Sequence, residues 1–394
     1  MIPIVKGFST PEGQFILQCL RSELLPGTGV VPPMQDLNWD NLFALLEKNR
    51  LAPYFYTFSK EHPGLFPQVI REKLRQARYH NLLYGDSCKH EVQEVLAGLR
   101  RAAIPVIVLK GWALIQWLYQ GDHAHRFCKD IDILVMRDQV AYAEAVLQQL
   151  GYKALKEVDP GFAQRFSNSQ AYRKAKAVSS QWRQFEIGLH WGLTHYPFFD
   201  EKRVNLGELF GWSLPINVAG VDVAELSLED QFIYTCAHLA LHHRHEETLL
   251  NFFEIAAIIS RAGALMDWQA VASRASAWGY VVQVRHVLTE IEKFWPEFVP
   301  QAALDKLSEV QTTRKELWVD QLVASTKGNR FRRAIVQIIA LPGLKNKSIV
   351  AFRYAFPRRE YMQHRYGVQG NNLIQAYRIR VSSAFVGIIH RSTR

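Results

Sequence analysis

The sequence predicts an α+β fold, in which a small mixed sheet is flanked by helical regions on both sides along the chain. In the first hundred residues apolar side chains recur at helical spacing, as at Trp39, Leu42 and Leu46. Short β-branched or alternating runs replace that spacing between residues 104 and 191, and helical spacing returns after Ser227. We therefore expect a helical N-terminal region (1–100), a mixed core (101–225) and a helical C-terminal region with a basic tail (226–394).

Length and composition describe an ordinary globular protein. The chain has 394 residues, of which 48% are apolar and 21% charged, enough for a large core. No apolar run approaches the roughly 18–20 residues that span a bilayer, and the N-terminus lacks the plan of a signal peptide. The four cysteines are scattered without a Cys-x-x-Cys pair, as in proteins that keep reduced thiols. We expect a cytoplasmic protein without a transmembrane segment.

The net charge of +10 is concentrated near the C-terminus. Residues 327–394 carry 14 basic side chains and one acidic side chain, so this tail has a charge of +13 and the remainder about −3. A field of this kind attracts polyanions such as RNA, DNA or an anionic membrane surface. The alternative is a solvated face of a helical domain, because surface charge bias carries no information about fold.

The core is expected to alternate strands and helices. A buried strand over 104–109 is followed by a helix over 111–119 and by a strand over 130–135. A helix over 140–150, capped by Asp138 and closed by Gly151, comes next. Further strands are expected over 172–178 and 182–191.

Two carboxylates in the strand over 130–135 are the first candidates for chemistry. Asp130 and Asp132 alternate with apolar residues, so both point to one face, about 6–7 Å apart. They repel each other unless a cation lies between them, and Mg²⁺ prefers carboxylates together with phosphate oxygens. Taken alone, an Asp-x-Asp pair is more often a solvated strand start.

Lys110 and Gly111 lie where the first core strand turns into a helix. Glycine lets a phosphate approach the backbone, and the start of a helix offers free N–H groups to it. Lys110 adds a cation at the same place. Together with Asp130 and Asp132, this order of strand, glycine turn, helix and Asp-x-Asp strand favours phosphoryl-transfer chemistry with divalent metal ions.

The same residues resemble a known family. The matching pattern is Ile104-Pro-Val, Leu109-Lys-Gly, Leu114, Tyr119, Arg126, Asp130-Ile-Asp-Ile-Leu-Val, Leu147 and Leu150-Gly-Tyr152. It is similar to the bacterial uncharacterised nucleotidyltransferase family, a divergent branch of the polymerase-beta-like superfamily. Weaker similarity extends over most of residues 35–260, including Leu189-His-Trp191 and His238-Leu-Ala-Leu-His-His243. The resemblance implies a nucleotidyltransferase core, NTP as substrate and Mg²⁺ or Mn²⁺ as cofactor.

The resemblance also implies roles for individual residues. Asp130 and Asp132 would hold metal, and Lys110 and Gly111 would cradle phosphates. The family commonly carries a third carboxylate two residues before the His-Trp pair, where this chain has Gly188.

Two residues before Gly188, Glu186 faces the same side by strand alternation. Either Glu186 completes a catalytic triad, or the third ligand is missing and the chain is weakly active or a pseudoenzyme, or the strand is wrongly assigned. In the long loop before the Asp pair, Arg126 and Lys129 are candidates to reach the triphosphate, with surface cations as the alternative.

Three histidines form a weaker signal. His238, His242 and His245 share one face of a predicted helix, and a pair at this spacing can bind zinc. No motif carboxylate or cysteine pair accompanies them, so packing or substrate contact is favoured. His190-Trp191 is interpreted as a core or cleft pair.

The sequence therefore predicts a metal-dependent nucleotidyltransferase that moves NMP from an NTP to an acceptor and releases pyrophosphate. The acceptor stays open among protein, peptide, RNA and small molecule. The alternative is a non-catalytic module that binds nucleotide, nucleic acid or protein.

Overall fold

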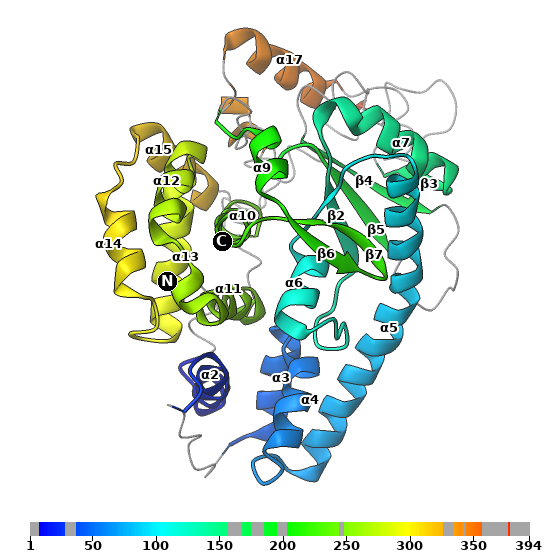
Figure 1. Cartoon of the computed structure of the whole chain (residues 1–394). Helices are drawn as coiled ribbons and strands as arrows, with labels where there is room; N and C mark the ends of the chain where they lie inside the picture. Colours follow the sequence, from blue (N-terminus) through cyan, green and yellow to red (C-terminus); the bar gives the residue numbers. More distant parts are fainter. Residues whose placement is uncertain are drawn as a thin grey trace.

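The structure is a computed structural model of the chain (Figure 1). It describes residues 8–27, 37–155, 168–174, 185–194, 203–243, 248–325, 334–336, 338–339, 341, 343–356 and 377–378. Within these ranges the molecule is a mixed α+β protein, as the sequence predicts.

One seven-stranded mixed sheet forms the centre, with the strand order β3-β4-β5-β2-β1-β7-β6. Its strands are β1 (Ile107–Leu109), β2 (Asp130–Leu134), β3 (Tyr152–Ala154), β4 (Ser169–Lys174), β5 (Glu186–His190), β6 (Leu214–Val218) and β7 (Val221–Glu225). The pairs β2–β5 and β1–β7 are parallel, whereas β1–β2, β3–β4, β4–β5 and β6–β7 are antiparallel. The two adjacent strands β2 and β5 therefore end at the same edge.

The register of the central strands separates a polar face from an apolar one. Asp130 is paired with Glu186, and Asp132 is paired with Gly188, so these four residues share one face of the sheet. The alternating residues, such as Ile131 and Ile187, are fully buried on the opposite face. This apolar face is part of the main hydrophobic core and fixes the register, since a slip by one residue would bury the carboxylates.

Helices α2–α5 precede the sheet. They are α2 (Pro11–Leu24), α3 (Trp39–Lys48), α4 (Ala52–Glu61) and α5 (Gln68–Arg101). In Figure 1, α2, α3 and α4 lie at one end of the molecule, while the long α5 runs from there to the sheet. The helix expected around Trp39 is confirmed, with Asn38 as its N-cap because the Asn38 side chain accepts from the backbone N–H of Asn41.

Within the described residues, helices α6, α7 and α9 lie between strands along the chain. Helix α6 (Gly111–Tyr119) has the bounds predicted from the sequence. Helix α7 (Val140–Gln149) follows a 3₁₀ turn over Arg137–Gln139 that contains Asp138, so Asp138 is not the N-cap that the sequence suggests. Gly151 ends this segment with a φ of +84°, as expected for a glycine after a helix. Helix α9 (Leu206–Trp212) precedes β6.

A group of helices follows the sheet, on the side away from α5 in Figure 1. Its members are α10 (Leu228–His242), α11 (Leu249–Ala262), α12 (Trp268–Trp278), α13 (Val281–Phe294), α14 (Gln301–Glu309) and α15 (Arg314–Ser325). Helix α17 (Leu344–Ala355) comes later in the chain and lies at the top of Figure 1. The expected cap at Ser227 is confirmed, because its side chain accepts from the backbone N–H of Asp230. Among the residues that the structure describes, no helix combines the length and apolar character that crossing a bilayer requires.

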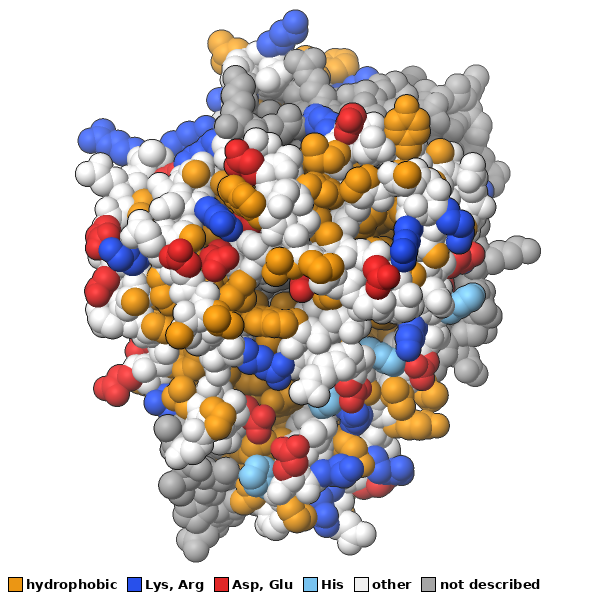
Figure 2. Space-filling view, in the orientation of Figure 1, with side chains coloured by type: hydrophobic (Ala, Val, Ile, Leu, Met, Phe, Trp, Pro, Cys, Tyr) orange, Lys and Arg blue, Asp and Glu red, His pale blue; other side chains and the backbone are white. Residues whose placement is uncertain are grey.

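Charge is distributed evenly over the face shown in Figure 2, where basic and acidic side chains are intermingled across most of the described surface. Most of the basic tail, 327–394, lies outside the described residues, as do Arg358 and Arg359. The strands expected over 172–178 and 182–191 correspond to β4 and β5, with residues 175–178 and 182–184 outside the described part.

Candidate functional site

Lys110 occupies the junction between β1 and α6 and points toward the carboxylates of β2. Its backbone has a φ of +35°, a region that non-glycine residues adopt only where the surroundings hold them. Its ammonium group provides such anchoring, since Nζ lies 2.7 Å from Asp132 Oδ2 and 2.8 Å from His238 Nε2. Strand β1, helix α10 and the Asp-x-Asp strand thus meet at the Lys110 side chain.

Asp132 is held by a partner at each carboxylate oxygen. Oδ2 accepts from Lys110, and Oδ1 lies 2.9 Å from His190 Nε2 at the end of β5. Burial alone would raise the pKa of Asp132, but the charges and hydrogen bonds of Lys110 and His190 hold this pKa well below its ordinary value. Asp132 is therefore an ionised carboxylate in the partly buried site.

Gly188 lies beside Asp132 on the neighbouring strand. A Cβ at this position would lie 2.1 Å from Asp132 Oδ1 and 3.0 Å from His190 Nε2, which is too close without movement. The space that a side chain would need is thus filled by the contact between Asp132 and His190. At the position where the resemblance led us to expect a third carboxylate, this chain has a glycine, and a histidine–aspartate contact takes up the space beside it.

Glu186 lies opposite Asp130 in the parallel pair of β2 and β5. Its carboxylate forms an ion pair with Arg173 on the adjacent strand β4. The backbone N–H of Glu186 donates to the carbonyl of Lys129, which ties the start of β5 to the loop before β2. Glu186 is on the expected face, but its charge is engaged by a cation rather than by the other two carboxylates.

Asp130 is less tightly held than Asp132. Burial and the neighbouring Asp132 charge raise the pKa of Asp130 above its ordinary value, while Lys110 and Lys129 act in the opposite direction. The charge of ionised Asp132 therefore disfavours ionisation of Asp130 unless a cation lies near both carboxylates. This is the electrostatic situation that a divalent cation relieves.

The residues present suit Mg²⁺ only together with ligands from elsewhere. Among the described residues, no group of three His, Cys, Asp or Glu side chains is arranged to hold a metal ion. Mg²⁺ commonly binds one or two carboxylates and completes its coordination shell with phosphate oxygens and water. Asp130 and Asp132 match the number of carboxylate ligands that such a site takes from the protein. The contacts of Asp132 with Lys110 and His190 would have to open first.

Arg126 reaches the start of α6 from the loop before β2. A Cβ on Gly111 would lie 3.4 Å from Arg126 Nη1 and 3.1 Å from Cys128 Sγ, so the guanidinium borders the backbone of the turn. Arg126 is anchored there by Glu254 of α11, with contacts of 2.5 Å from Nε and 3.2 Å from Nη2. Lys129 is exposed, and its charge acts on Asp130.

Helix α10 contributes residues that the sequence did not assign to this site. The hydroxyl of Tyr234 is buried and has no hydrogen-bond partner within the described part of the chain. Burial and the charges of Asp132 and Asp130 raise the pKa of Tyr234, which places this group in their field. Tyr234 stands four residues before His238, so one helix face carries both, a spacing that could have linked them.

The other histidines of this segment stack rather than gather around a cation. The rings of His238 and His242 are parallel, with centroids 4.7 Å apart. His245, the third histidine of the predicted face, lies outside the described residues. Trp191, next to His190, is buried in the core, as interpreted from the sequence.

Comparison with known proteins gives one family and several distant structural likenesses. No curated protein matches the chain. The solution structure of the antibiotic-resistance factor ANT(2'')-Ia is 13% identical, with a TM-score of 0.32 over 51% of this chain and 94% of that one. A crystal structure of ANT(2'')-Ia with adenylyl-2''-tobramycin is 12% identical, with a TM-score of 0.32 over 51% and 97%.

A further likeness is to an antigenic nucleotidyltransferase-like protein from Paracoccidioides brasiliensis. It is 13% identical, with a TM-score of 0.36 over 58% of this chain and 95% of that one. The family profile described as "Uncharacterised nucleotidyltransferase" matches residues 35–296, which span the sheet, the Lys110–Asp132 contact and helices α10 to α13. The chain therefore belongs to the uncharacterised nucleotidyltransferase family.

Proposed function

We propose that this chain transfers a nucleoside monophosphate from an NTP to an acceptor. An oxygen of the acceptor attacks the α-phosphorus, the bond from that phosphorus to the bridging oxygen of the β-phosphate breaks, and pyrophosphate leaves. Membership of the family supports nucleotidyl transfer in general. The observation that carries the detailed proposal is the 2.7 Å contact between Lys110, at the glycine turn, and Asp132 of the Asp-x-Asp strand.

In this proposal Asp130 and Asp132 hold Mg²⁺ or Mn²⁺. Such an ion, when bound, neutralises phosphate charge and polarises the oxygens at the reacting phosphorus. The chain's own share is to present two carboxylates on one face of β2, with the second kept ionised by its neighbours. Asp132 becomes available as a ligand when Lys110 exchanges it for a phosphate oxygen and the contact with His190 opens.

The start of α6 is the proposed phosphate site. Gly111 has no side chain to block the backbone, and the first turn of a helix presents unpaired N–H groups. In this proposal Lys110 at the turn, Arg126 beside Gly111 and the exposed Lys129 of the loop before β2 supply positive charge to the triphosphate. Arg126 does so while it remains paired with Glu254.

Glu186 is the proposed third carboxylate, assisting deprotonation of the acceptor hydroxyl. It stands opposite Asp130 in the sheet, which supports the role, and it must leave Arg173 to perform it. The acceptor is a protein, a peptide, an RNA or a small molecule, and the same assay distinguishes them.

The proposal is tested by incubating the full chain with each labelled NTP, Mg²⁺ or Mn²⁺ and candidate acceptors, and by scoring pyrophosphate. Asp130→Asn and Asp132→Asn are expected to reduce turnover by about 10³-fold or more. The matched control is Asp138→Asn, an exposed carboxylate in the 3₁₀ turn after β2. Turnover that survives in either site variant would contradict the assignment.

A second candidate function is non-catalytic binding of a nucleotide, a nucleic acid or a protein partner. The observation that favours it is the glycine at 188, together with the engagement of Asp132 by Lys110 and His190. In that case NTP binds to the wild-type chain in a filter or calorimetric assay without release of pyrophosphate. Binding with turnover excludes this alternative.

A further inference from the structure

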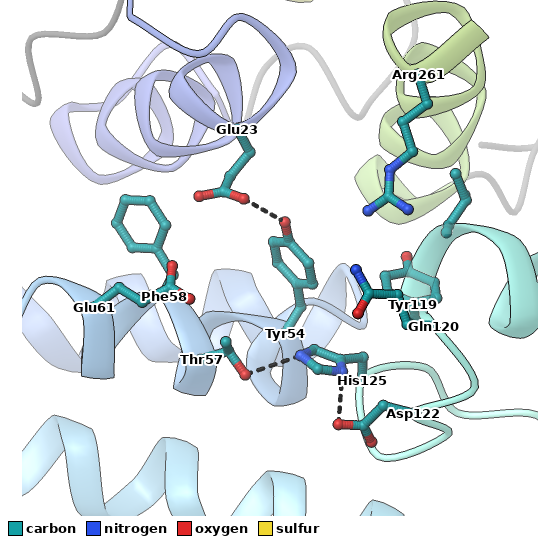
Figure 3. Close-up of a pocket in the computed structure, with 11 residues that line it drawn as sticks. Glu23, Tyr54, Thr57, Phe58, Glu61, Tyr119, Gln120, Asp122, His125 and Arg261 are labelled. Carbon is teal, nitrogen blue, oxygen red and sulfur yellow. Dashed lines mark hydrogen bonds and ion pairs between the residues drawn. The ribbon is translucent and has the colours of Figure 1, made fainter.

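A cavity of about 420 Å³ lies at the opposite end of α6 from the Lys110 turn. It opens between α2, α4, the end of α6 and α11 (Figure 3). At 1.5 Å per residue, the nine residues of α6 put roughly 13 Å between its two ends. The cavity is therefore a separate place on the molecule, not a part of the candidate phosphate site.

A buried layer of side chains also separates the two places. Tyr119, in the cavity wall, donates its hydroxyl to Glu254 at 3.2 Å, and Glu254 in turn holds Arg126 at the Gly111 turn. Glu254 and Tyr119 are both buried. A molecule in the cavity thus contacts this layer without reaching the carboxylates of β2.

Aromatic rings form the inner wall of the cavity. The ring centroids of Tyr54 and Tyr119 are 6.1 Å apart, and the imidazole of His125 stacks on Tyr119 at 5.7 Å with an angle of 10°. Phe58 and Leu118 complete the apolar lining. Aromatic faces attract cations as well as apolar groups.

His125 takes part as a neutral ring. Thr57 Oγ1 lies within hydrogen-bond distance of its Nε2, at 2.9 Å, whereas Asp122 Oδ2 lies 3.2 Å from its Nδ1 without the geometry of a hydrogen bond (Figure 3). Burial and the nearby Arg78 charge lower the pKa of His125 below its ordinary value, which outweighs the opposite effect of Asp122. At neutral pH this side chain adds no positive charge to the wall.

Two carboxylates stand at the rim on the side of α2 and α4. Glu23 accepts from the hydroxyl of Tyr54 at 3.1 Å, and the side chain of Glu61 has no hydrogen bond or ion pair with any residue that the structure describes. Partial desolvation raises the pKa of Glu23, opposed by the Tyr54 hydroxyl and reinforced by the charge of Glu61. The two acids therefore repel each other across the cavity mouth.

The remaining charges leave this mouth negative. Asp122 is matched by Arg78 at 2.5 Å. Arg261 extends toward the cavity from α11 (Figure 3). Among the described lining residues it is the cation that balances the charges of Glu23 and Glu61. It also donates a hydrogen bond to the carbonyl of Trp117, at 2.8 Å. Counting only the residues that the structure describes, one negative charge in the lining is thus unmatched, in a protein whose net charge is +10.

We propose that this cavity binds an organic cation, namely a primary ammonium group carried on an apolar body. The ammonium group lies between Glu23 and Glu61, over the ring of Tyr54, and the apolar body lies against Tyr119 and Phe58. A bare metal ion fits less well, because no three ligating side chains among the described residues are arranged to hold one. The positive charge of the ligand neutralises the unmatched negative charge at the cavity opening, and the aromatic wall contacts its apolar body.

The test uses the full chain and three probes of similar shape, namely phenethylamine, 2-phenylethanol and 3-phenylpropionate. Binding is followed by ligand-observed NMR and calorimetry, without nucleotide, so that the result does not depend on the proposed transfer reaction. For a ligand of this size, we expect phenethylamine to bind with a dissociation constant of about 1 mM. The neutral alcohol is expected to bind at least about fivefold more weakly, because it lacks the charge.

Glu61→Gln is the informative variant, since this side chain is exposed and forms no hydrogen bond or ion pair among the described residues that the change would break. It should weaken phenethylamine binding about fivefold, and Glu23→Gln should add to the effect. Glu47→Gln, an exposed glutamate on α3, is the matched control and should bind as wild type does. Equal binding of the amine and the alcohol, preference for the carboxylate probe, or unchanged binding in the doubly substituted chain would each overturn the proposal.

Discussion

Gly188→Ala tests the geometry around Asp132 directly. The added Cβ would lie 2.1 Å from Asp132 Oδ1, so that oxygen must retreat to at least 3.0 Å. Asp132 cannot retreat freely, because Lys110 holds one oxygen at 2.7 Å and His190 holds the other at 2.9 Å. One of these two hydrogen bonds must lengthen.

The expected loss of stability follows from three contributions. Forcing an extra methyl group into a packed site costs about 1–3 kcal/mol. Weakening a hydrogen bond to a charged group costs about 1.5–3 kcal/mol when the bond is broken entirely. Alanine is better than glycine in a strand by roughly 0.5–1 kcal/mol, which acts in the opposite direction. Because the hydrogen bond is lengthened and not broken, only part of the second contribution applies, and together these predict a decrease of about 2 kcal/mol in the free energy of unfolding.

Urea unfolding followed by circular dichroism measures this decrease. The control is Gly211→Ala in α9, where a Cβ would meet no atom within 4 Å and alanine should raise stability slightly. His190→Ala combined with Gly188→Ala should cost less than the two single changes together, because the methyl group then has room. The reasoning is refuted if Gly188→Ala behaves like the Gly211 control.

Three further predictions concern charge. Glu254→Gln leaves the Arg126 guanidinium without its carboxylate and should lower the free energy of unfolding by about 3–5 kcal/mol in urea. Burial raises the pKa of Glu225 from 4.5 to about 7, so the stability present below pH 4.5 should be lost as pH rises through about 7. Glu225→Gln should remove that dependence, a difference of about 1–2 kcal/mol at pH 8 after allowing for partial exposure. Reversing the charge of Arg358 and Arg359 should weaken any binding of tRNA, duplex DNA or anionic vesicles, and on nucleic acid the salt slope should fall by about 0.7–0.9 for each phosphate that is no longer neutralised.

Each of these three predictions would be contradicted by a specific result. A loss below about 1 kcal/mol in Glu254→Gln would mean that the Arg126 charge is solvated despite its buried partner. Parallel pH–stability curves for wild type and Glu225→Gln would mean that this carboxylate titrates normally. Equal, weak polyanion binding by the wild type and the charge-reversed chain would identify the basic tail as a solvated face.

Elements dominated by local signals could be predicted from the sequence. Helix α6 is bounded by a strand with β-branched residues and by its own apolar run, so its limits follow from neighbours in the chain. The same holds for the shared face of Asp130 and Asp132, since alternation along a strand is a property of the backbone. The position of Lys110 at a strand–helix junction is equally local.

Features that depend on pairing between distant segments could not be predicted. Arg173 meets Glu186 only because β4 and β5 are antiparallel neighbours, which no local pattern specifies. Arg126 and Glu254 are separated by 128 positions in the chain.

The β6–β7 hairpin was not predicted, although Ala219 and Gly220 both have a positive φ, as in a two-residue hairpin turn. An Ala-Gly pair is a weaker turn signal than Asn-Gly, so the sequence alone did not indicate it.

The absence of a side chain at Gly188 allows Asp132 to contact both Lys110 and His190. Without a side chain at 188, the Asp132 carboxylate approaches His190, and that approach leaves Oδ2 for Lys110. A phosphate oxygen would compete with Asp132 for the Lys110 ammonium group, and a metal ion would compete with Lys110 and His190 for the Asp132 oxygens. We infer that arrival of the triphosphate, a stronger anion than one carboxylate, would draw Lys110 away and release Asp132 in the same event. The catalytic and the binding-only proposals differ in whether nucleotide binding weakens the contacts of Asp132 with Lys110 and His190.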